Sequence, residues 1–249
     1  MRRYGLRDDQ WDRIKDFLPG REGHVGGTAA DNRQFVEAVL FRYRAGVPWR
    51  DLPERFGGWK IVYQRFNRWA KSGVFERIFK LLASDHDNEY MMIDATIVRA
   101  HQHSAGAQKD GEQAIGRSRG GLTTKIHALV DALGNPVELM LTPGQAHDLT
   151  CAESLLEAAD PGALLGDKAY DADSLIGTLA QRGITPVIPP KANRKLPRAC
   201  DFALYCERNL IERFFNKLKH YRAIATRYDK LAKIFLAGVQ LASAMILLN

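Results

Sequence analysis

Residues 90–98, YMMIDATIV, form a short apolar run that a single acid, Asp94, interrupts. An apolar run of this length predicts a buried β-strand. An aspartate inside such a strand is costly unless a cation or hydrogen-bond donors compensate its charge. This stretch therefore predicts the start of a sheet and a polar site within that sheet.

The residues that follow predict the rest of a mixed sheet. Residues 122–144 indicate a β-hairpin that turns at Gly134 and Asn135, and residues 163–171, ALLGDKAYD, indicate a buried strand that ends on Asp167. The remaining expected elements are a helix at 171–183, a strand at 184–190, a helix at 205–222 and a last helix from about 229. This order predicts an α/β fold with helices flanking a mixed sheet.

The first 85 residues indicate helices only, and the expected domains are therefore 1–85 and 86–249. A turn with two glycines before residues 59–73 gives the outline of a helix-turn-helix. The second helix of this outline carries Lys60, Arg65 and Arg68, which we expect to contact DNA. The alternative is a small three-helix bundle with a charged outer face.

Charge and cysteine content narrow the class of protein. The chain has 249 residues, 45% of them hydrophobic, and a formal charge of +7, which favours a globular protein with a polyanionic partner. That partner is a nucleic acid or an acidic membrane surface. Three cysteines without a CxxC pair predict neither a disulfide framework nor a zinc site, so a reducing cytoplasm is expected. The apolar run Ile234–Leu248 is too short to span a bilayer and predicts a buried helix.

Residues 205–222 place four polar side chains on one stripe of a helix. At about 100° per residue, Tyr205, Arg208, Glu212 and Lys219 fall within about 60° of arc. The stripe could simply be a solvated helix face on which Glu212 pairs with Arg208 or Asn216. It could also be part of a functional site, for which the rest of the chain supplies the evidence.

Two acids occupy positions where an acid is costly, and two explanations are open. Separately, Asp167 could cap the next helix, and Asp94 could pair with Arg99 or Lys125. Together, on neighbouring strands, Asp94 and Asp167 could share divalent ions, with Glu212 as a third ligand. Two such ions about 4 Å apart would clamp the attacking and leaving oxygens during phosphodiester cleavage.

The residues around these acids carry a family resemblance. Asp94 in IDAT, Asp167 in GDKAYD, and the spacing Tyr-x2-Arg-x3-Glu-x6-Lys from Tyr205 to Lys219 resemble the Asp-Asp-Glu (DDE) transposases of bacterial insertion sequences, in particular the insertion sequence 5 family. Residues 116–127, GRSRGGLTTKIH, and 143–148, PGQAHD, extend the likeness over nearly the whole chain. The resemblance implies an RNase H-like catalytic domain that cuts and joins DNA with two Mg²⁺ or Mn²⁺ ions.

The resemblance also implies roles for individual residues. Asp94, Asp167 and Glu212 would be the catalytic metal ligands, and Tyr205, Arg208 and Lys219 would contact the strand being cut. Arg117 and Arg119, in a basic loop, and Lys125 are further expected DNA contacts. No covalent enzyme intermediate is required.

The implied partners follow from the same likeness. They are the terminal inverted repeats and target DNA, bound by a homodimer or larger assembly near the bacterial nucleoid, with no membrane involved. The alternatives are a sequence-specific DNA-binding regulator and an RNase H-like nuclease without strand transfer.

Overall fold

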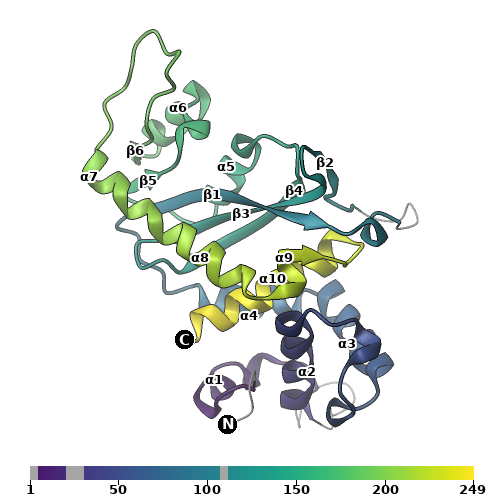
Figure 1. The fold of residues 1–249 in the computed structure, drawn as a ribbon. Helices are drawn as coiled ribbons and strands as arrows, with labels where there is room; N and C mark the ends of the chain where they lie inside the picture. The colour runs from purple at the N-terminus through teal and green to yellow at the C-terminus, as the bar shows by residue number, and fades with distance from the viewer. Residues whose placement is uncertain (1–4, 21–30, 107–111) are drawn as a thin grey trace.

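The structure is a computed structural model that describes residues 5–20, 31–106 and 112–249. A helical region lies beside a sheet that is flanked by further helices (Figure 1). The helices are α1 Asp8–Asp12, α2 Asn32–Ala45, α3 Trp59–Lys71, α4 Val74–Leu82, α5 Ala152–Leu156, α6 Asp173–Gln181, α7 Phe202–Tyr205, α8 Asn209–Lys219, α9 Arg222–Ala225 and α10 Ala232–Leu247. The strands are β1 Met91–Ala100, β2 Gly116–Ser118, β3 Gly121–Asp131, β4 Pro136–Pro143, β5 Ala163–Leu165, β6 Thr185–Val187 and β7 Thr226–Arg227.

Local sequence signals set the bounds of the long helix α2. The carboxylate of Asp31 accepts a hydrogen bond of 2.8 Å from the backbone N–H of Gln34, which caps the start of the helix. Gly46 ends it with φ of 73°, a left-handed conformation that favours glycine. Near the N-terminus the helical structure is short, consisting of α1 and a 3-10 turn at Lys15–Phe17, and the Phe17 side chain is 52% exposed.

The segment before α3 differs from the expected helix-turn-helix outline. In place of a first α-helix it forms two 3-10 turns, Trp49–Asp51 and Glu54–Phe56. Pro53 explains the interruption, because proline disfavours helical dihedrals in the residue before it and lacks a backbone N–H. The second helix, α3, forms as expected and is followed closely by α4.

The sheet is centred on β1. On one side β1 pairs antiparallel with β3, which pairs antiparallel with β4; on the other side β1 pairs parallel with β5, and β5 pairs parallel with β6. Two short strands, β2 and β7, extend the edges of β3 and β1. Three antiparallel strands followed by two parallel strands form an RNase H-like sheet, which confirms the expected fold class.

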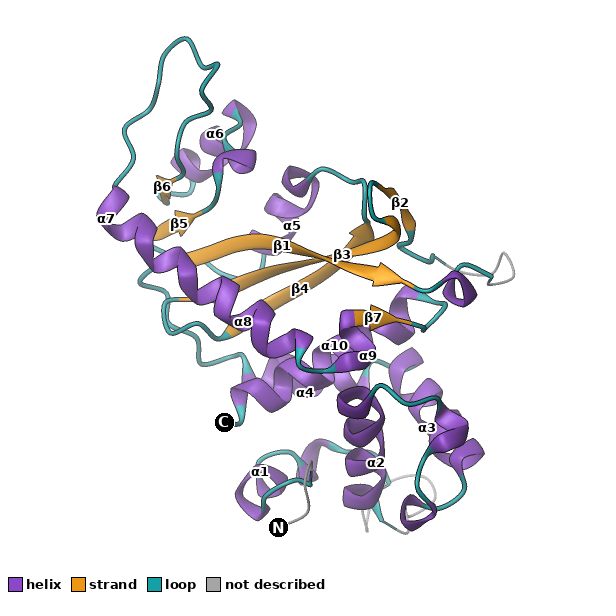
Figure 2. Cartoon of the chain, in the orientation of Figure 1, coloured by secondary structure: helices purple, strands orange, loops and turns teal. Residues whose placement is uncertain are grey.

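Side chains of β1 alternate between two cores, as the period of a strand requires. Met92 and Val98 belong to one core with residues of α8 and α10, whereas Met91 and Ile93 belong to a second core with residues of α5 and α6. Helix α8 runs across one face of the sheet (Figure 2). Asp94 shares the parity of Met92 and Val98, so the register directs it toward the face that α8 covers.

The C-terminal helix α10 connects the two regions. It packs against α2, α3 and α4 as well as α8 and β4. Its residues and those of the N-terminal helices share one continuous core. As expected, it is a buried helix, and within the described ranges no helix is long and apolar enough to cross a membrane.

Candidate active site

Asp94 and Asp167 occupy equivalent positions on neighbouring parallel strands. The register pairs Met91 with Leu164 and Met92 with Leu165. Two residues further along each chain, this register brings Asp94 of β1 opposite Asp167, which directly follows β5. Adjacent strands lie about 4.8 Å apart, so the two acids are neighbours at the end of the parallel pair.

Burial dominates the electrostatics of Asp94. It raises the pKa of this carboxyl, and the negative charge of Asp167 adds to the effect. The backbone N–H of Ala95, which donates a 2.7 Å hydrogen bond, and the positive charge of Arg208 partly offset this rise. Asp94 is therefore a carboxylate that gains from a nearby cation.

Arg208 supplies a cation to two acids at once. Its Nη1 donates a 2.6 Å hydrogen bond to Asp94, and its Nη2 donates a 2.8 Å hydrogen bond to Glu212. Burial opposes the charge of Arg208, but Asp94, Tyr205 and Glu212 together outweigh burial and raise the pKa of the guanidinium. The pairing of Glu212 with Arg208 was an open alternative in the sequence and is confirmed; Asp94 pairs with Arg208 and not with Arg99 or Lys125.

Asp167 lies at the edge of a small pocket. Its carboxylate accepts a 2.8 Å hydrogen bond from the backbone N–H of Ala169, so it caps the following 3-10 turn, as the separate explanation predicted. Beside it is a cavity of about 410 Å³ that Lys168, Lys191 and Asn193 also line. Lys168 and Lys191 are exposed, so two ammonium groups face solvent next to this acid.

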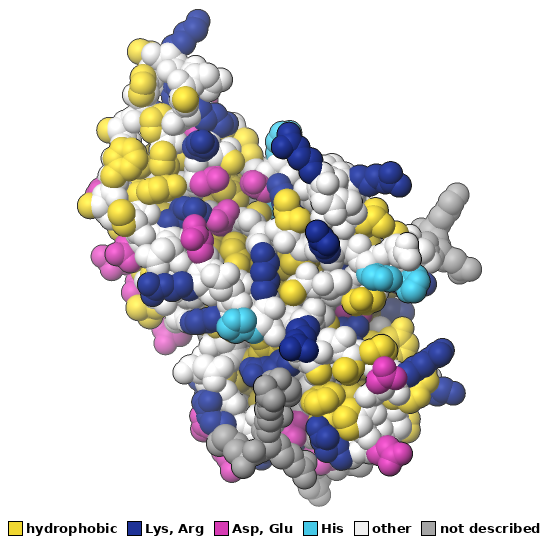
Figure 3. Space-filling model, in the orientation of Figure 1, with side chains coloured by type: hydrophobic (Ala, Val, Ile, Leu, Met, Phe, Trp, Pro, Cys, Tyr) yellow, Lys and Arg dark blue, Asp and Glu magenta, His cyan; other side chains and the backbone are white. Residues whose placement is uncertain are grey.

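The three acids do not form a closed metal site as they stand. Within residues 5–20, 31–106 and 112–249, no three His, Cys, Asp or Glu side chains are grouped so that they could hold a metal ion. Asp94 and Asp167 are neighbours, while Arg208 stands between Asp94 and Glu212. Acidic side chains gather where α8 crosses the sheet, with Lys and Arg around them (Figure 3).

The other residues of the helical stripe lie close to this arrangement. The Tyr205 ring centroid is 5.9 Å from the guanidinium carbon of Arg208. Lys219 is half-buried at the far end of α8, about two turns beyond Glu212. The helix expected at 205–222 is divided: Tyr205 ends α7, Arg208 lies in a 3-10 turn at Cys206–Arg208, and Glu212 and Lys219 lie on α8. Arg208 nevertheless contacts both Tyr205 and Glu212.

The basic residues of α3 divide into two groups. Lys60 and Arg68 are exposed on its outer face. Arg65 instead packs inward: its guanidinium carbon lies 4.3 Å from the Phe35 ring centroid, and its Nη2 donates a hydrogen bond to Asn32. Burial lowers the pKa of Arg65. Its contacts therefore stabilise the helical region, whereas Lys60 and Arg68 remain accessible.

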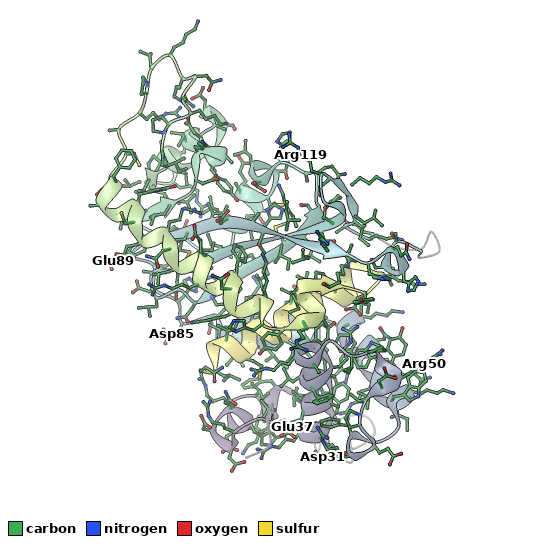
Figure 4. The ribbon with its side chains drawn as sticks, viewed as in Figure 1. Asp31, Glu37, Arg50, Asp85, Glu89 and Arg119 are labelled. Atoms are coloured by element: carbon green, nitrogen blue, oxygen red, sulfur yellow. The ribbon has the colours of Figure 1, made fainter. Side chains whose placement is uncertain are left out.

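The basic residues at the sheet edge that were expected to contact DNA also differ in their exposure. Arg117 of β2 and Arg119 of the turn after it are exposed, and Arg119 projects from the outside of the molecule (Figure 4). Lys125 is only 12% exposed, and its Nζ donates hydrogen bonds to Asp148 at 2.6 Å and to the carbonyl of Ala146 at 2.7 Å. In this arrangement Lys125 fastens the loop after β4 to β3.

Sequence reasoning missed the acid that anchors the basic segment 191–200. Asp171 is buried and accepts hydrogen bonds from the backbone N–H of Lys191, from Arg194 and from Arg198. These donors outweigh burial and hold the pKa of Asp171 below its usual range. No local spacing reveals this anchor, because Arg194 and Arg198 lie 23 and 27 residues from Asp171 along the chain.

Fold and site together define a class of protein. An RNase H-like sheet with one acid within β1, a second just after the neighbouring β5, and a third on the helix that crosses them is the framework of enzymes that act on phosphodiesters.

Comparison with protein families identifies the member of this class. Residues 86–247 match the family described as "Transposase DDE domain", and residues 6–79 match "Putative transposase of IS4/5 family". The chain belongs to the DDE-domain transposases. Enzymes of this family cleave DNA and transfer strands, and they use divalent metal ions.

Individual relatives agree with the family. The chain is 44% identical over 130 residues to the "Putative transposase for insertion sequence element IS6501" of Brucella ovis, covering 51% of this chain and 100% of that protein. It is 50% identical over 105 residues to "Uncharacterized protein y4sN" of Sinorhizobium fredii, covering 42% of this chain and 84% of that protein.

Solved structures of transposases resemble the fold more distantly. A piggyBac transposase synaptic complex with hairpin DNA has a TM-score of 0.43 and 14% identity over 76% of this chain, which spans only 48% of that chain. A Mos1 transposase paired-end complex has a TM-score of 0.29 and 12% identity, over 92% of this chain and 81% of that one.

Proposed function

We propose that this transposase binds the terminal repeats of an insertion sequence and uses Asp94, Asp167 and Glu212 to cut and join DNA. The observation that carries the proposal is the register that sets Asp94 opposite Asp167, with Glu212 tied to Asp94 through Arg208. Family membership supplies the type of reaction.

The donor set fits a hard divalent cation. All three side chains offer carboxylate oxygens, the ligands that Mg²⁺ and Mn²⁺ prefer, and burial makes the charge of Asp94 costly without a cation. When bound, such ions polarise the phosphodiester and lower the pKa of an attacking water. Glu212 can join Asp94 as a ligand when Arg208 leaves its position between them.

The chain's own cations would position the DNA strand. Lys168 and Lys191 border the cavity beside Asp167 and are placed to contact phosphates on that side of the site. Once released, Arg208 would neutralise charge that develops in the transition state, together with Lys219 and the nearby Tyr205.

The outer face of α3 is proposed to contact the terminal repeat. Lys60 and Arg68 are exposed there, beside the exposed Gln64, and together they present charge and an amide to a groove or backbone. Arg117 and Arg119 would add phosphate contacts from the sheet edge. Because two element ends must be held together, the active form is proposed to be a homodimer or larger assembly.

One experiment tests the proposal directly. Purified protein is incubated with Mn²⁺ and DNA that carries the flanking repeats, and the cut ends are mapped. Cleavage at the repeat ends, followed by joining of the 3′ ends to a second DNA, is expected; Asp94→Asn should bind this DNA without cutting it. Cutting without joining would indicate a nuclease, and activity that survives a chelator would contradict the metal assignment.

A further inference from the structure

A large groove lies where the helical region meets residues 228–234. Its cavity is about 1160 Å³, and its lining includes Trp49, Trp59 and Tyr63 of the helical region together with Tyr228. We call it the junction groove. Pockets for small molecules usually measure about 300 to 1,000 Å³, so this space suits a segment of a longer molecule. None of the proposed metal ligands lines it.

The rings of the junction groove are accessible and held in place. Tyr63 is 41% exposed and Tyr228 is 46% exposed, while Trp49 and Trp59 are half-buried. The Tyr228 ring stacks on His101 with centroids 4.6 Å apart and planes inclined by 22°. Trp49 supports Tyr63 with centroids 5.6 Å apart. Large rings that are fixed on one side and open on the other are platforms for a flat ligand.

The charge of the groove favours an anion. Arg50, Lys71 and Lys230 line it and are exposed, and Arg50 lies at the outer edge of the helical region (Figure 4). The acid that lines it, Asp229, is buried and already paired with Arg42 at 3.3 Å. The lining is therefore cationic at its rim and neutralised at its base.

A buried donor at the base of the groove lacks a partner. Arg42 lines the cavity, its side chain is only 5% exposed, and its Nε finds no hydrogen-bond acceptor among the described residues. Buried donors without a partner are rare, and an acceptor on a bound water or ligand is one arrangement that satisfies them. This observation is independent of the aromatic lining, and it points to the same cavity.

We propose that the junction groove binds unpaired nucleotides of DNA. Aromatic platforms with adjacent cations are the combination that single-stranded nucleic acid requires, because every base has a face that stacks and every nucleotide carries a phosphate. Bases stack on Trp59, Tyr63 and Tyr228, and the phosphates face Arg50, Lys71 and Lys230. Only the choice of DNA as the polyanion rests on the proposed function.

Intrinsic fluorescence offers a direct test, since Trp49 and Trp59 are two of the four tryptophans in the chain. Asp94→Asn protein, which should not cut DNA, is titrated with a single-stranded thymidine octamer and with an abasic octamer of the same length. Quenching by the thymidine octamer, with at least tenfold weaker binding of the abasic one, is expected. Equal affinity for both would overturn the proposal, because phosphates alone would then account for binding.

Matched variants locate the site. Tyr228→Leu and Lys230→Gln should each weaken octamer binding about fivefold or more, with an unchanged unfolding midpoint. Two control variants should leave octamer binding unchanged. They are Phe17→Leu, which alters an exposed ring elsewhere, and Lys233→Gln, which alters an exposed lysine outside the lining. Should Tyr228→Leu fail to fold, Lys230→Gln alone decides, and an unaltered affinity in it contradicts the proposal.

A duplex that carries the terminal repeat separates this proposal from the function itself. Tyr228→Leu should bind the fully paired duplex as tightly as its parent. If the parent binds the octamer but not the duplex, the proposed recognition of terminal repeats fails and the groove assignment stands. If the parent binds the duplex but not the octamer, the groove assignment fails and the proposed recognition of terminal repeats stands.

Discussion

Arg208 donates a 2.6 Å hydrogen bond to Asp94 across the interface between α8 and the sheet, while the same guanidinium reaches Glu212 at 2.8 Å. The Arg208 and Asp94 side chains are 17% and 21% exposed, so their attraction is less screened than that of a surface pair. One cation thus balances two carboxylates that the proposed reaction needs for metal ions. Asp94 and Glu212 cannot pair with Arg208 and bind a metal ion between them at the same time.

Removal of Arg208 should therefore strengthen metal binding. In Arg208→Ala, Asp94 and Glu212 lose their internal cation, so Mn²⁺ affinity measured by calorimetry should rise several-fold, while DNA cleavage falls because the arginine is lost from the site. Arg213→Ala, which removes an exposed arginine of the same helix, is the control. Unchanged Mn²⁺ affinity in Arg208→Ala would show that the arginine does not compete with the ion.

Arg68 and Arg65 of α3 should behave differently although they lie three residues apart. Arg68→Ala should weaken binding to the terminal repeat by roughly 1 to 3 kcal/mol if the side chain reads a base, with little change in stability. Arg65→Ala should lower the free energy of unfolding by about 1 kcal/mol, since it removes packing on Phe35 and Trp69. Duplex binding assays and urea unfolding measure the two effects. The reverse pattern would assign the reading role to Arg65.

His127 should make the protein less stable in mild acid. It is fully buried, with Nε2 2.7 Å from the Thr142 hydroxyl, and burial lowers its pKa to about 4 from 6.5. Below pH 6.5 the unfolded chain takes up the proton more readily than the folded one, so stability falls until pH approaches 4. The full loss is about 3 kcal/mol.

Urea unfolding at pH 7 and pH 5 measures this contribution of His127. His127→Gln should flatten the difference, whereas His220→Gln, at an exposed position, should leave it intact. An equally steep loss of stability in His127→Gln would assign the acid sensitivity to another group.

Asp171 should control the order of the segment 191–200. In Asp171→Asn the buried charge that holds Arg194 and Arg198 is gone, so trypsin should cleave within this segment at least several-fold faster. Asp173→Asn, which alters the exposed partner of the same arginines, should have a smaller effect. Equal cleavage rates in both variants would contradict an anchoring role for Asp171.

Much of the fold follows from local sequence. The turn at Gly134 and the strand that leads to Asp167 are each set by residues close in the chain, and each was predicted. The site was predictable in part, because a carboxylate within an apolar strand is unfavourable unless a cation or hydrogen-bond donors compensate its charge. Spacing along α8 also placed Arg208 beside Glu212.

The remaining features depend on contacts between distant segments. Sequence spacing on α3 does not tell that Phe35 and Trp69 draw Arg65 inward, because Phe35 comes from another helix. The partner of Lys125 is fixed only when the loop after β4 folds back on β3. The competition between Arg208 and a metal ion for Asp94 likewise arises from tertiary structure alone.

The position of α10 has a consequence for how the protein is made. This helix completes the core of α2, α3 and α4, yet the ribosome synthesises it later than α1 to α9 and the seven described strands. The earliest helices must therefore wait with apolar surface uncovered until translation has passed residue 247. During that interval their exposed apolar surface is available to chaperones. In a chain that is released before α10 is made, this surface would stay exposed.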